Sequence, residues 1–327
     1  MSLKKLADLK LTPNINSFEK HISFLKSGVE KALKNIPLND TPNYLYDPIR
    51  YIINGKGKRL RPVLVHLVGH SYSADPEDLM KASIAVELLH NFTLVHDDIM
   101  DNDNIRHGQP SVHIKWDEPT AILSGDAIFV LSQLLLIGLP TIIIQRFNEV
   151  SLNICEGQGM DKQFENDTSI SMGQYLIMIG KKTGALLGLC AEFGALLSGI
   201  KKENAHSLFE YGLNLGLAFQ IQDDLLDIFG DESSMGKSLG SDISKKKQTA
   251  LTILARDNNS EKWLDFINNH SKISDYQSYF DKNGIRLEVE KAVAHYIEKA
   301  NSALIYSPES DKEHLQKFTT MILKRKF

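Results

Sequence analysis

A length of 327 residues allows one large or two ordinary domains, and the content of 42% hydrophobic and 24% charged residues is that of a globular chain with ample core. A formal net charge of -4 gives no support to a nucleic-acid-binding protein. The N-terminus lacks the apolar core of a signal peptide, and the longest apolar stretch, residues 127–144, is too interrupted to span a membrane. We therefore expect a cytoplasmic protein in which Cys155 and Cys190 are reduced core thiols.

A basic stretch follows the first helical patterns. Residues 54–62 read Asn-Gly-Lys-Gly-Lys-Arg-Leu-Arg-Pro, in which cations crowd together and two glycines let backbone amides approach a ligand. The spacing of a P-loop is absent. Taken alone the stretch is best interpreted as an exposed basic turn, but a diphosphate-binding role becomes preferable if the chain also binds metal ions.

The next helix is predicted to begin at Asp75-Pro76, a suitable N-cap and first helical residue, and to continue to Asp101. Asp97, Asp98 and Asp101 lie within one turn at its C-terminal end, where the helix dipole already favours cations. Clustered oxygen ligands suit a hard ion such as Mg²⁺. A solvated acidic helix end is an equally acceptable interpretation of this motif by itself.

The polar segment 102–110 follows this helix. Its acidic residues superficially resemble a calcium-binding EF loop, but Arg106 stands where that loop requires glycine. We interpret Arg106 as a phosphate ligand instead.

Three further helical patterns follow, with glycines and lysines inside them. Gly157 and Gly159 indicate close helix crossings, because no strand precedes them as a dinucleotide-binding motif requires. Lys181 and Lys182 are adjacent, so we expect one at the surface and one directed into a cavity. The predicted ranges begin at Pro119, run from Ile142 to about Phe164, and run from Ser171 through Leu197.

A second acidic motif decides between the interpretations of the first. Asp223, Asp224 and Asp227 repeat the Asp-Asp-x-x-Asp spacing at the end of a helix predicted from Glu203 to Phe229. Two such motifs, facing each other across a helical bundle, would clamp metal ions that bridge to a phosphorylated ligand. Residues 230–247 could form a mobile lid, and shorter amphipathic helices follow. Without strand alternation, the chain is predicted to be a single all-α helical bundle.

These motifs, in this order, resemble those of the trans-isoprenyl diphosphate synthases of the polyprenyl synthetase family over nearly the whole chain. The resemblance implies the all-α isoprenoid synthase fold, one domain over residues 1–327, a deep central cavity and a homodimer. It also implies condensation of isopentenyl diphosphate with an allylic diphosphate through an ionised allylic cation. Three Mg²⁺ ions bridging to the allylic diphosphate are expected from it.

The resemblance assigns roles to individual residues. The metal ligands it implies are Asp97, Asp98, Asp101, Asp223, Asp224 and Asp227. The substrate-binding residues are Lys58, Arg61, His90, Arg106, His107 and Lys247. The residues lining the reaction centre are Lys182, Thr183, Gln220 and Lys237.

One residue departs from the family pattern. The family usually has two adjacent arginines after the first acidic motif, and here the second is His107. Histidine titrates near neutrality and cannot make a bidentate guanidinium contact. Weaker or pH-sensitive binding of isopentenyl diphosphate is therefore expected.

Product length is predicted from the helix below the first acidic motif. Phe92 lies five residues before Asp97, with Thr93 above it and Leu89 below it. Simple core packing is the commoner role of a helical Phe, but in this family a bulky residue at that place limits the product to short chains. The motif lacks a two-residue insertion and is similar to archaeal-type geranylgeranyl diphosphate synthases. We therefore expect a C20 product, with C15 farnesyl diphosphate as the alternative and C25 as a further possibility.

Two other classes of protein are considered. A terpene cyclase would share the fold and the first motif, but the Asp-Asp-x-x-Asp form of the second motif and the basic stretch argue against it. A noncatalytic subunit of a heteromeric synthase would be expected to lack metal ligands, whereas both acidic motifs are intact here.

Overall fold

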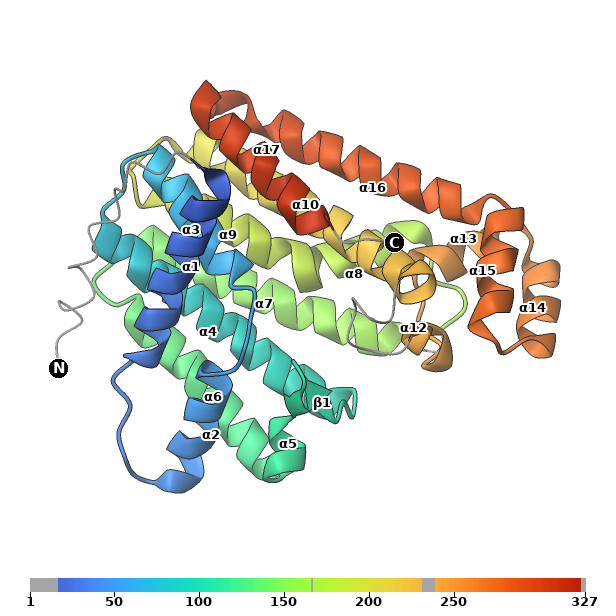
Figure 1. The fold of residues 1–327 in the computed structure, drawn as a ribbon, viewed down its shortest axis with the longest axis horizontal. Helices are drawn as coiled ribbons and strands as arrows, with labels where there is room; N and C mark the ends of the chain where they lie inside the picture. Colours follow the sequence, from blue (N-terminus) through green and yellow to red (C-terminus); the bar gives the residue numbers. More distant parts are fainter. Residues whose placement is uncertain (1–16, 166, 231–238, 325–327) are drawn as a thin grey trace. The chain divides into compact units, whose positions relative to one another are not determined.

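The computed structural model describes residues 17–165, 167–230 and 239–324. Apart from one short two-stranded ribbon, the regular structure of these residues is helical, which confirms the predicted all-α class (Figure 1). Within them, no helix is both long enough and apolar enough to cross a membrane. Residue contacts divide the chain into two compact units, and we describe each by itself. The single domain with a deep central cavity stays a prediction.

The first unit comprises Met1–Asn148 and Cys190–His206. It includes the first part of α7 (Thr141–Phe164), the last part of α9 (Ala185–Leu196) and the start of α10 (Lys202–Phe229). Its complete elements are α1 (Phe18–Lys34), α2 (Asn43–Ile53), α3 (Leu60–Ser71), α4 (Pro76–Met100), β1 (Ile105–Arg106), β2 (Gln109–Pro110), α5 (Val112–Lys115) and α6 (Glu118–Leu135).

Helix α4 is the centre of the first unit. It packs against α1, α2, α3, α5 and α6. Almost every side chain from Leu79 to Leu89 is buried, as expected of a helix that is stable only inside a core. The predicted N-cap is confirmed, because Asp75 Oδ1 accepts hydrogen bonds from the N–H groups of Glu77 at 2.9 Å and Asp78 at 3.1 Å. The core thereby fixes the helix whose far end carries the first acidic motif.

The second unit comprises Glu149–Leu189 and Ser207–Phe327, and so includes the remaining parts of α7, α9 and α10. Its other elements are α8 (Met172–Ile179), the π-helical turn η2 (Gly180–Gly184), α12 (Ser241–Ser244), α13 (Ala250–Asn258), α14 (Ser260–Asn269), α15 (Ile273–Lys282), α16 (Ile285–Ser302), the 3₁₀ turn η3 (Ala303–Tyr306) and α17 (Glu309–Leu323).

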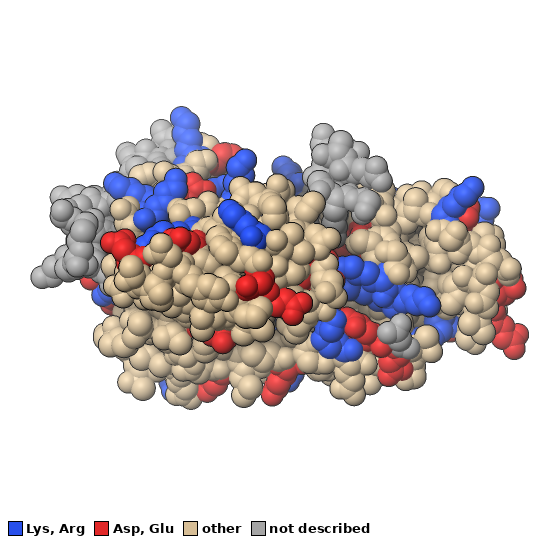
Figure 2. Space-filling view, turned by 90° about the horizontal axis from the view of Figure 1, so that it is seen from below, with Lys and Arg blue, Asp and Glu red and all other residues tan. Residues whose placement is uncertain are grey.

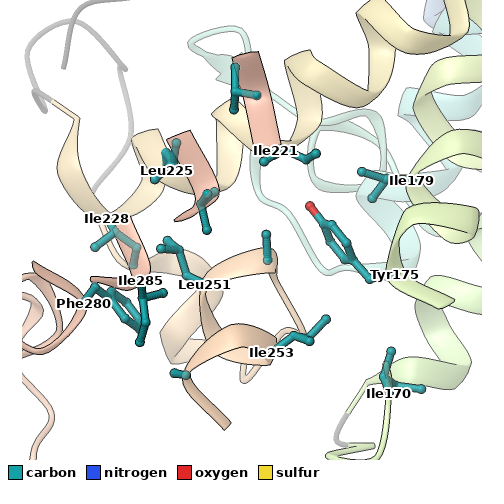
Figure 3. Close-up of a cluster of buried hydrophobic side chains, with 14 of the residues drawn as sticks. Ile170, Tyr175, Ile179, Ile221, Leu225, Ile228, Leu251, Ile253, Phe280 and Ile285 are labelled. Atoms are coloured by element: carbon teal, nitrogen blue, oxygen red, sulfur yellow. The ribbon is translucent and has the colours of Figure 1, made fainter. Parts of the chain in front are cut away.

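The apolar core of the second unit joins α8, α10, α13, α15 and α16. Figure 3 shows Tyr175 of α8 near Ile221 of α10, with Leu225 of α10 and Leu251 of α13 in the same cluster. Ser171, predicted to open a helix here, is the N-cap of α8 and forms a capping box. This core fixes the helix that carries the second acidic motif.

The helix predicted from Ser171 through Leu197 is confirmed in its extent, but it contains a π-helical turn that was not predicted. Helix α8 ends at Ile179, and the π-helical turn η2 precedes α9. Gly184 in this turn lies against α10, where an added Cβ would come within 3.0 Å of the carbonyl oxygen of Leu213. Sequence periodicity contains no information on this contact, and π-helical turns of this kind are frequent at functional sites.

Candidate active site

The C-terminal end of α4 carries three carboxylates of the first unit. Asp97 and Asp98 lie in its last turn, Asp101 is the C-cap, and no basic residue lies in that turn. Asp98 is only 3% exposed. Burial raises the pKa of Asp98, and the hydrogen bond from Arg106 opposes this rise. Acids at the negative end of a helix dipole favour a bound cation, and their oxygen atoms suit Mg²⁺.

Arg106 reaches back to this motif from the β-ribbon. Its Nε donates to Asp98 Oδ1 at 2.8 Å, and its Nη2 donates to the same oxygen and lies 3.6 Å from Asp103 Oδ2. Strands β1 and β2 are joined by His107 and Gly108, whose φ angles of 52° and 77° are typical of a tight type I′ hairpin. The ribbon thus holds a predicted diphosphate ligand against a predicted metal ligand.

The basic turn between α2 and α3 divides its cations between two roles. Lys58 is exposed, whereas Arg59 is buried and its Nη1 donates to Glu87 of α4 at 2.6 Å. Arg61 Nη1 lies 3.1 Å from Nε2 of His90, also on α4. Burial, and then the charge of Arg61, hold the pKa of His90 well below its ordinary value. A neutral His90 therefore accepts the hydrogen bond from the guanidinium.

These groups form one cluster with the β-ribbon. After burial, the neighbouring Arg61, His107 and Arg106 oppose protonation of His90 and so lower its pKa further. The pKa of His107 is lowered by burial and then by the charges of Arg106 and Arg59. We call this set the basic cluster: Lys58, Arg59, Arg61, His90, Arg106 and His107. It brings together the residues predicted to bind isopentenyl diphosphate and lies in the same unit as the first acidic motif.

A row of three aromatic rings begins at Phe92, five residues before Asp97 on α4. The ring centroid of Phe92 on α4 lies 5.1 Å from that of Phe129 on α6. The centroid of Phe129 in turn lies 6.4 Å from that of Phe147 on α7. Leu89 is fully buried, and the Thr93 hydroxyl donates to a backbone carbonyl of α4 at 2.8 Å. The predicted chain-length residue is therefore backed by two further rings of the first unit.

The π-helical turn of the second unit presents two predicted reaction-centre residues. Lys182 Nζ lies 2.5 Å from Asp161 Oδ2 of α7. Thr183 Oγ1 donates to Gln220 Oε1 of α10 at 3.1 Å. Each side chain is thus held by a partner from another helix of the same unit.

The neighbouring lysine and glycines show how closely α7 approaches the π-helical turn η2. Lys181 pairs separately with Glu156 of α7. A Cβ added to Gly157 would lie 2.4 Å from the backbone nitrogen of Lys182, which confirms a close helix crossing there. The same prediction is wrong for Gly159, where an added Cβ would meet nothing within 4 Å. Both adjacent lysines therefore pair with acids of α7.

In the second acidic motif, Asp224 is bonded inside its own unit. Asp224 Oδ2 accepts hydrogen bonds from the Tyr175 hydroxyl at 2.6 Å and from the N–H of Ala250 at 3.0 Å. Burial, and then the charge of Asp242, raise the pKa of Asp224 to about 8. In Figure 3 the Tyr175 oxygen points toward α10. Asp224 therefore ties α8 and the start of α13 to α10.

Asp227 is bonded to the segment that begins α12. Its two oxygens accept hydrogen bonds from the Ser241 hydroxyl at 2.7 Å and from the N–H of Asp242 at 3.0 Å. Asp223 is the half-buried member of the motif. The three acids of this motif are thus not equivalent.

Two predicted residues lie at the segment after α10. The N–H of Lys247 donates to the carbonyl of Asp242 at 2.9 Å. Lys237 lies outside the described residues. Within the described ranges, no three His, Cys, Asp or Glu side chains are arranged so that they could hold a metal ion together.

Glu87 and Tyr175 are the site residues that sequence reasoning missed. Glu87 stands in the run Ile84-Ala85-Val86-Glu87-Leu88-Leu89, and an ionisable residue in such an apolar run requires a buried partner. That requirement was the available indication, although it does not identify Arg59 as the partner. Nothing in the local sequence distinguishes Tyr175 from an ordinary core aromatic residue.

Comparison with known proteins gives consistent matches. The sequence model of the family described as polyprenyl synthetase matches residues 42–282. Geranylgeranyl diphosphate synthase of Methanosarcina mazei is 40% identical over 235 residues, which cover 70% of this chain and 72% of that protein. A crystal structure of a geranylgeranyl pyrophosphate synthase has a TM-score of 0.87 and 34% identity, covering 96% of this chain and 100% of its own. A polyprenyl synthase from Caulobacter crescentus, complexed with calcium and isoprenyl diphosphate, has a TM-score of 0.84 and 26% identity, covering 100% and 98% of the respective chains.

Proposed function

Because the chain belongs to the polyprenyl synthetase family and is a short-chain trans-isoprenyl diphosphate synthase, we propose that it condenses isopentenyl diphosphate with allylic diphosphates and releases mainly C20 geranylgeranyl diphosphate. The observation that carries the proposal is that the basic cluster and the first acidic motif lie in the same unit. The cluster offers cations for phosphate groups, and the motif offers carboxylates for a metal ion. Relatives named as geranylgeranyl diphosphate synthases favour C20 over C15.

The basic cluster accounts for the binding of both diphosphates in this proposal. Isopentenyl diphosphate binds to Lys58 and Arg61, with His90 orienting the Arg61 guanidinium. Arg106 binds the allylic diphosphate. A guanidinium has five N–H donors, so Nε and Nη2 can stay on Asp98 while Nη1 donates to a phosphate oxygen.

We propose that three Mg²⁺ ions bind at the two acidic motifs, because carboxylate oxygens are the ligands that this ion prefers. The first motif supplies its three carboxylates at a helix end without a basic residue. In the second motif the proposed ligands are Asp223, Asp224 and Asp227, and oxygens of the last two also accept hydrogen bonds from within their own unit. When bound, Mg²⁺ neutralises the leaving diphosphate, which favours ionisation of the allylic C–O bond.

Residues of the second unit are proposed to act at the reacting carbons. Thr183 and Gln220 direct their side-chain oxygens toward the allylic cation and stabilise it without forming a bond to it. The hydrogen bond between them holds both side chains in place. Lys182, held by Asp161, adds positive charge for the departing diphosphate. That diphosphate then accepts the proton lost after the new C–C bond forms. Lys237 and Lys247 are assigned to the same diphosphate.

Product analysis by chain length tests this function. The purified chain is incubated with Mg²⁺, isopentenyl diphosphate and either dimethylallyl or farnesyl diphosphate. A product pool ending at C20 is expected from both primers, and a pool ending at C15 would establish the second candidate, a farnesyl diphosphate synthase. Release of a hydrocarbon or alcohol without condensation would indicate a terpene cyclase. Absence of turnover by the isolated chain would indicate a noncatalytic subunit.

His107 is expected to make the binding of isopentenyl diphosphate pH-dependent. Its lowered pKa leaves it neutral near pH 7, and Arg106, Arg59 and Lys58 oppose its protonation while Glu87 favours it. We therefore expect the KM for isopentenyl diphosphate to fall as the pH is lowered below the ordinary histidine pKa of about 6.5. His107→Arg should lower this KM about tenfold at neutral pH, because one charge-assisted hydrogen bond contributes roughly 1.5 kcal/mol.

Initial rates from about pH 5 to 8 check this prediction, because a lowered pKa places the protonation of His107 below about 6.5. His107→Asn is the control, because asparagine also tolerates the positive φ but does not titrate. Any pH dependence left in this variant comes from the substrate or from other ionisable groups of the protein. A wild-type profile identical to that of His107→Asn would contradict the prediction.

A homodimer is proposed with α6 at the interface. Leu123, Val130 and Leu134 of α6 and the following Ile137 are 46%, 55%, 55% and 66% exposed, and their spacing places them on one face. Figure 2 shows a broad surface with few charged side chains. Leu134→Arg should shift the sedimentation mass from dimer to monomer, whereas Leu264→Arg, at an exposed leucine of α14, should not. Cytoplasmic localisation stays a prediction.

A further inference from the structure

We infer that Glu87 is a positioning residue for isopentenyl diphosphate, acting through Arg59 on the turn that carries Lys58 and Arg61. The inference deepens the proposed function and depends on it for the identity of the ligand. Neither Glu87 nor Arg59 is proposed to touch the substrate.

The Arg59 guanidinium holds three parts of the first unit together. Its Nη1 donates to Glu87 Oε1 at 2.6 Å, and the two side chains are 6% and 4% exposed. Its Nη2 lies 3.4 Å from the carbonyl oxygen of Ile53 at the end of α2 and also donates to the carbonyl of Gly55. One side chain thus connects α4, the end of α2 and the turn between α2 and α3.

The backbone of Arg59 needs this anchoring. Its φ of 53° and ψ of 33° place it in the left-handed region, which is unfavourable for a residue with a Cβ, and it is the N-cap of α3. Gly57 leaves room for the buried side chain, because an added Cβ would lie 3.1 Å from Arg59 Nη1. With Arg59 directed inward, Lys58 on one side is exposed and Arg61 on the other reaches His90.

The carboxylate of Glu87 also acts on Arg61 and His107 of the basic cluster. It raises the pKa of Arg61 and of His107, although burial lowers both more strongly. Without this carboxylate, Arg59 would be a buried cation without an acid partner, next to several other cations. Because such a cation is unstable in the core, Arg59 would leave its place and the turn would lose its conformation.

Steady-state kinetics of Glu87→Gln test the inference. We expect the KM for isopentenyl diphosphate to rise at least tenfold and the KM for the allylic diphosphate to change less than twofold. The matched control is Glu192→Gln, which breaks another largely buried pair of the same unit, Arg146 Nε to Glu192 Oε2 at 2.9 Å. It should lower the thermal midpoint similarly and leave both KM values unchanged.

A double variant separates positioning from stability. Arg59→Met with Glu87→Leu replaces the buried pair by apolar side chains, a change that often preserves stability. It should fold with a midpoint near that of the wild type and still show the raised KM for isopentenyl diphosphate, because nothing ties the turn to Ile53 and Gly55. A folded double variant with the wild-type KM would overturn the inference.

Binding of inorganic diphosphate, measured by calorimetry, distinguishes failure of the inference from failure of the proposed function. Lys58→Ala defines the binding that belongs to this turn. If the wild type shows no turnover, the proposed function fails, and loss of the same binding in Glu87→Gln still supports positioning. Retention of that binding in Glu87→Gln overturns it.

Discussion

Replacement of Asp98 by asparagine is expected to lower kcat about a thousandfold, because roughly 4 kcal/mol of charge stabilisation at the proposed metal site would be lost. Asp98 is almost fully buried and is bonded to Arg106, so one side chain connects the proposed metal site with the proposed diphosphate ligand. Asparagine keeps the size of the side chain and an oxygen acceptor, so the fold should persist. Single-turnover rates and their dependence on Mg²⁺ concentration measure the effect.

Asp103→Asn is the matched control, because Asp103 also pairs with Arg106, at 3.6 Å, but is not a proposed metal ligand. Its kcat should stay within about threefold of the wild type, as expected for a partly exposed pair. If Asp98→Asn lost only as much activity as Asp103→Asn, with unchanged Mg²⁺ dependence, Asp98 would be a holder of Arg106 rather than a metal ligand.

Phe92→Ala is expected to extend the main product from C20 to C25 and longer chains. The ring of Phe92 lies in a row with those of Phe129 and Phe147, so its removal opens space that the remaining rings border. The free energy of unfolding should fall by less than the ~3 kcal/mol of a fully buried Phe, because Phe92 is only half-buried. Chromatography of the dephosphorylated products measures the chain length.

Phe318→Leu is a suitable control for that experiment. Phe318 is fully buried on α17, so its replacement should lower stability while the product stays at C20. A C20 product from Phe92→Ala, with the protein folded, would assign Phe92 to core packing alone. Longer products from Phe318→Leu would indicate that general loosening, not the aromatic row, changes the length.

The sequence alone determined the features that depend on neighbouring residues. The cap at Asp75, the helix start at Ser171 and the acids at the end of α4 lie where periodicity and capping predicted them. Such features are predictable because a helix is specified by side chains three or four residues apart and by hydrogen bonds of its first turn. Motif order predicted the family in the same way, since each motif is a short run of residues.

Only the tertiary structure decided which partner each buried charge has. Arg59, counted from the sequence among the cations for diphosphate, pairs with Glu87, 28 positions away. Asp224, predicted as a metal ligand, bonds to Tyr175, 49 positions away. A buried charge is stable only with an opposite charge or hydrogen-bond partner within contact distance. That distance is set by the packing of helices from distant parts of the chain, which no local pattern specifies.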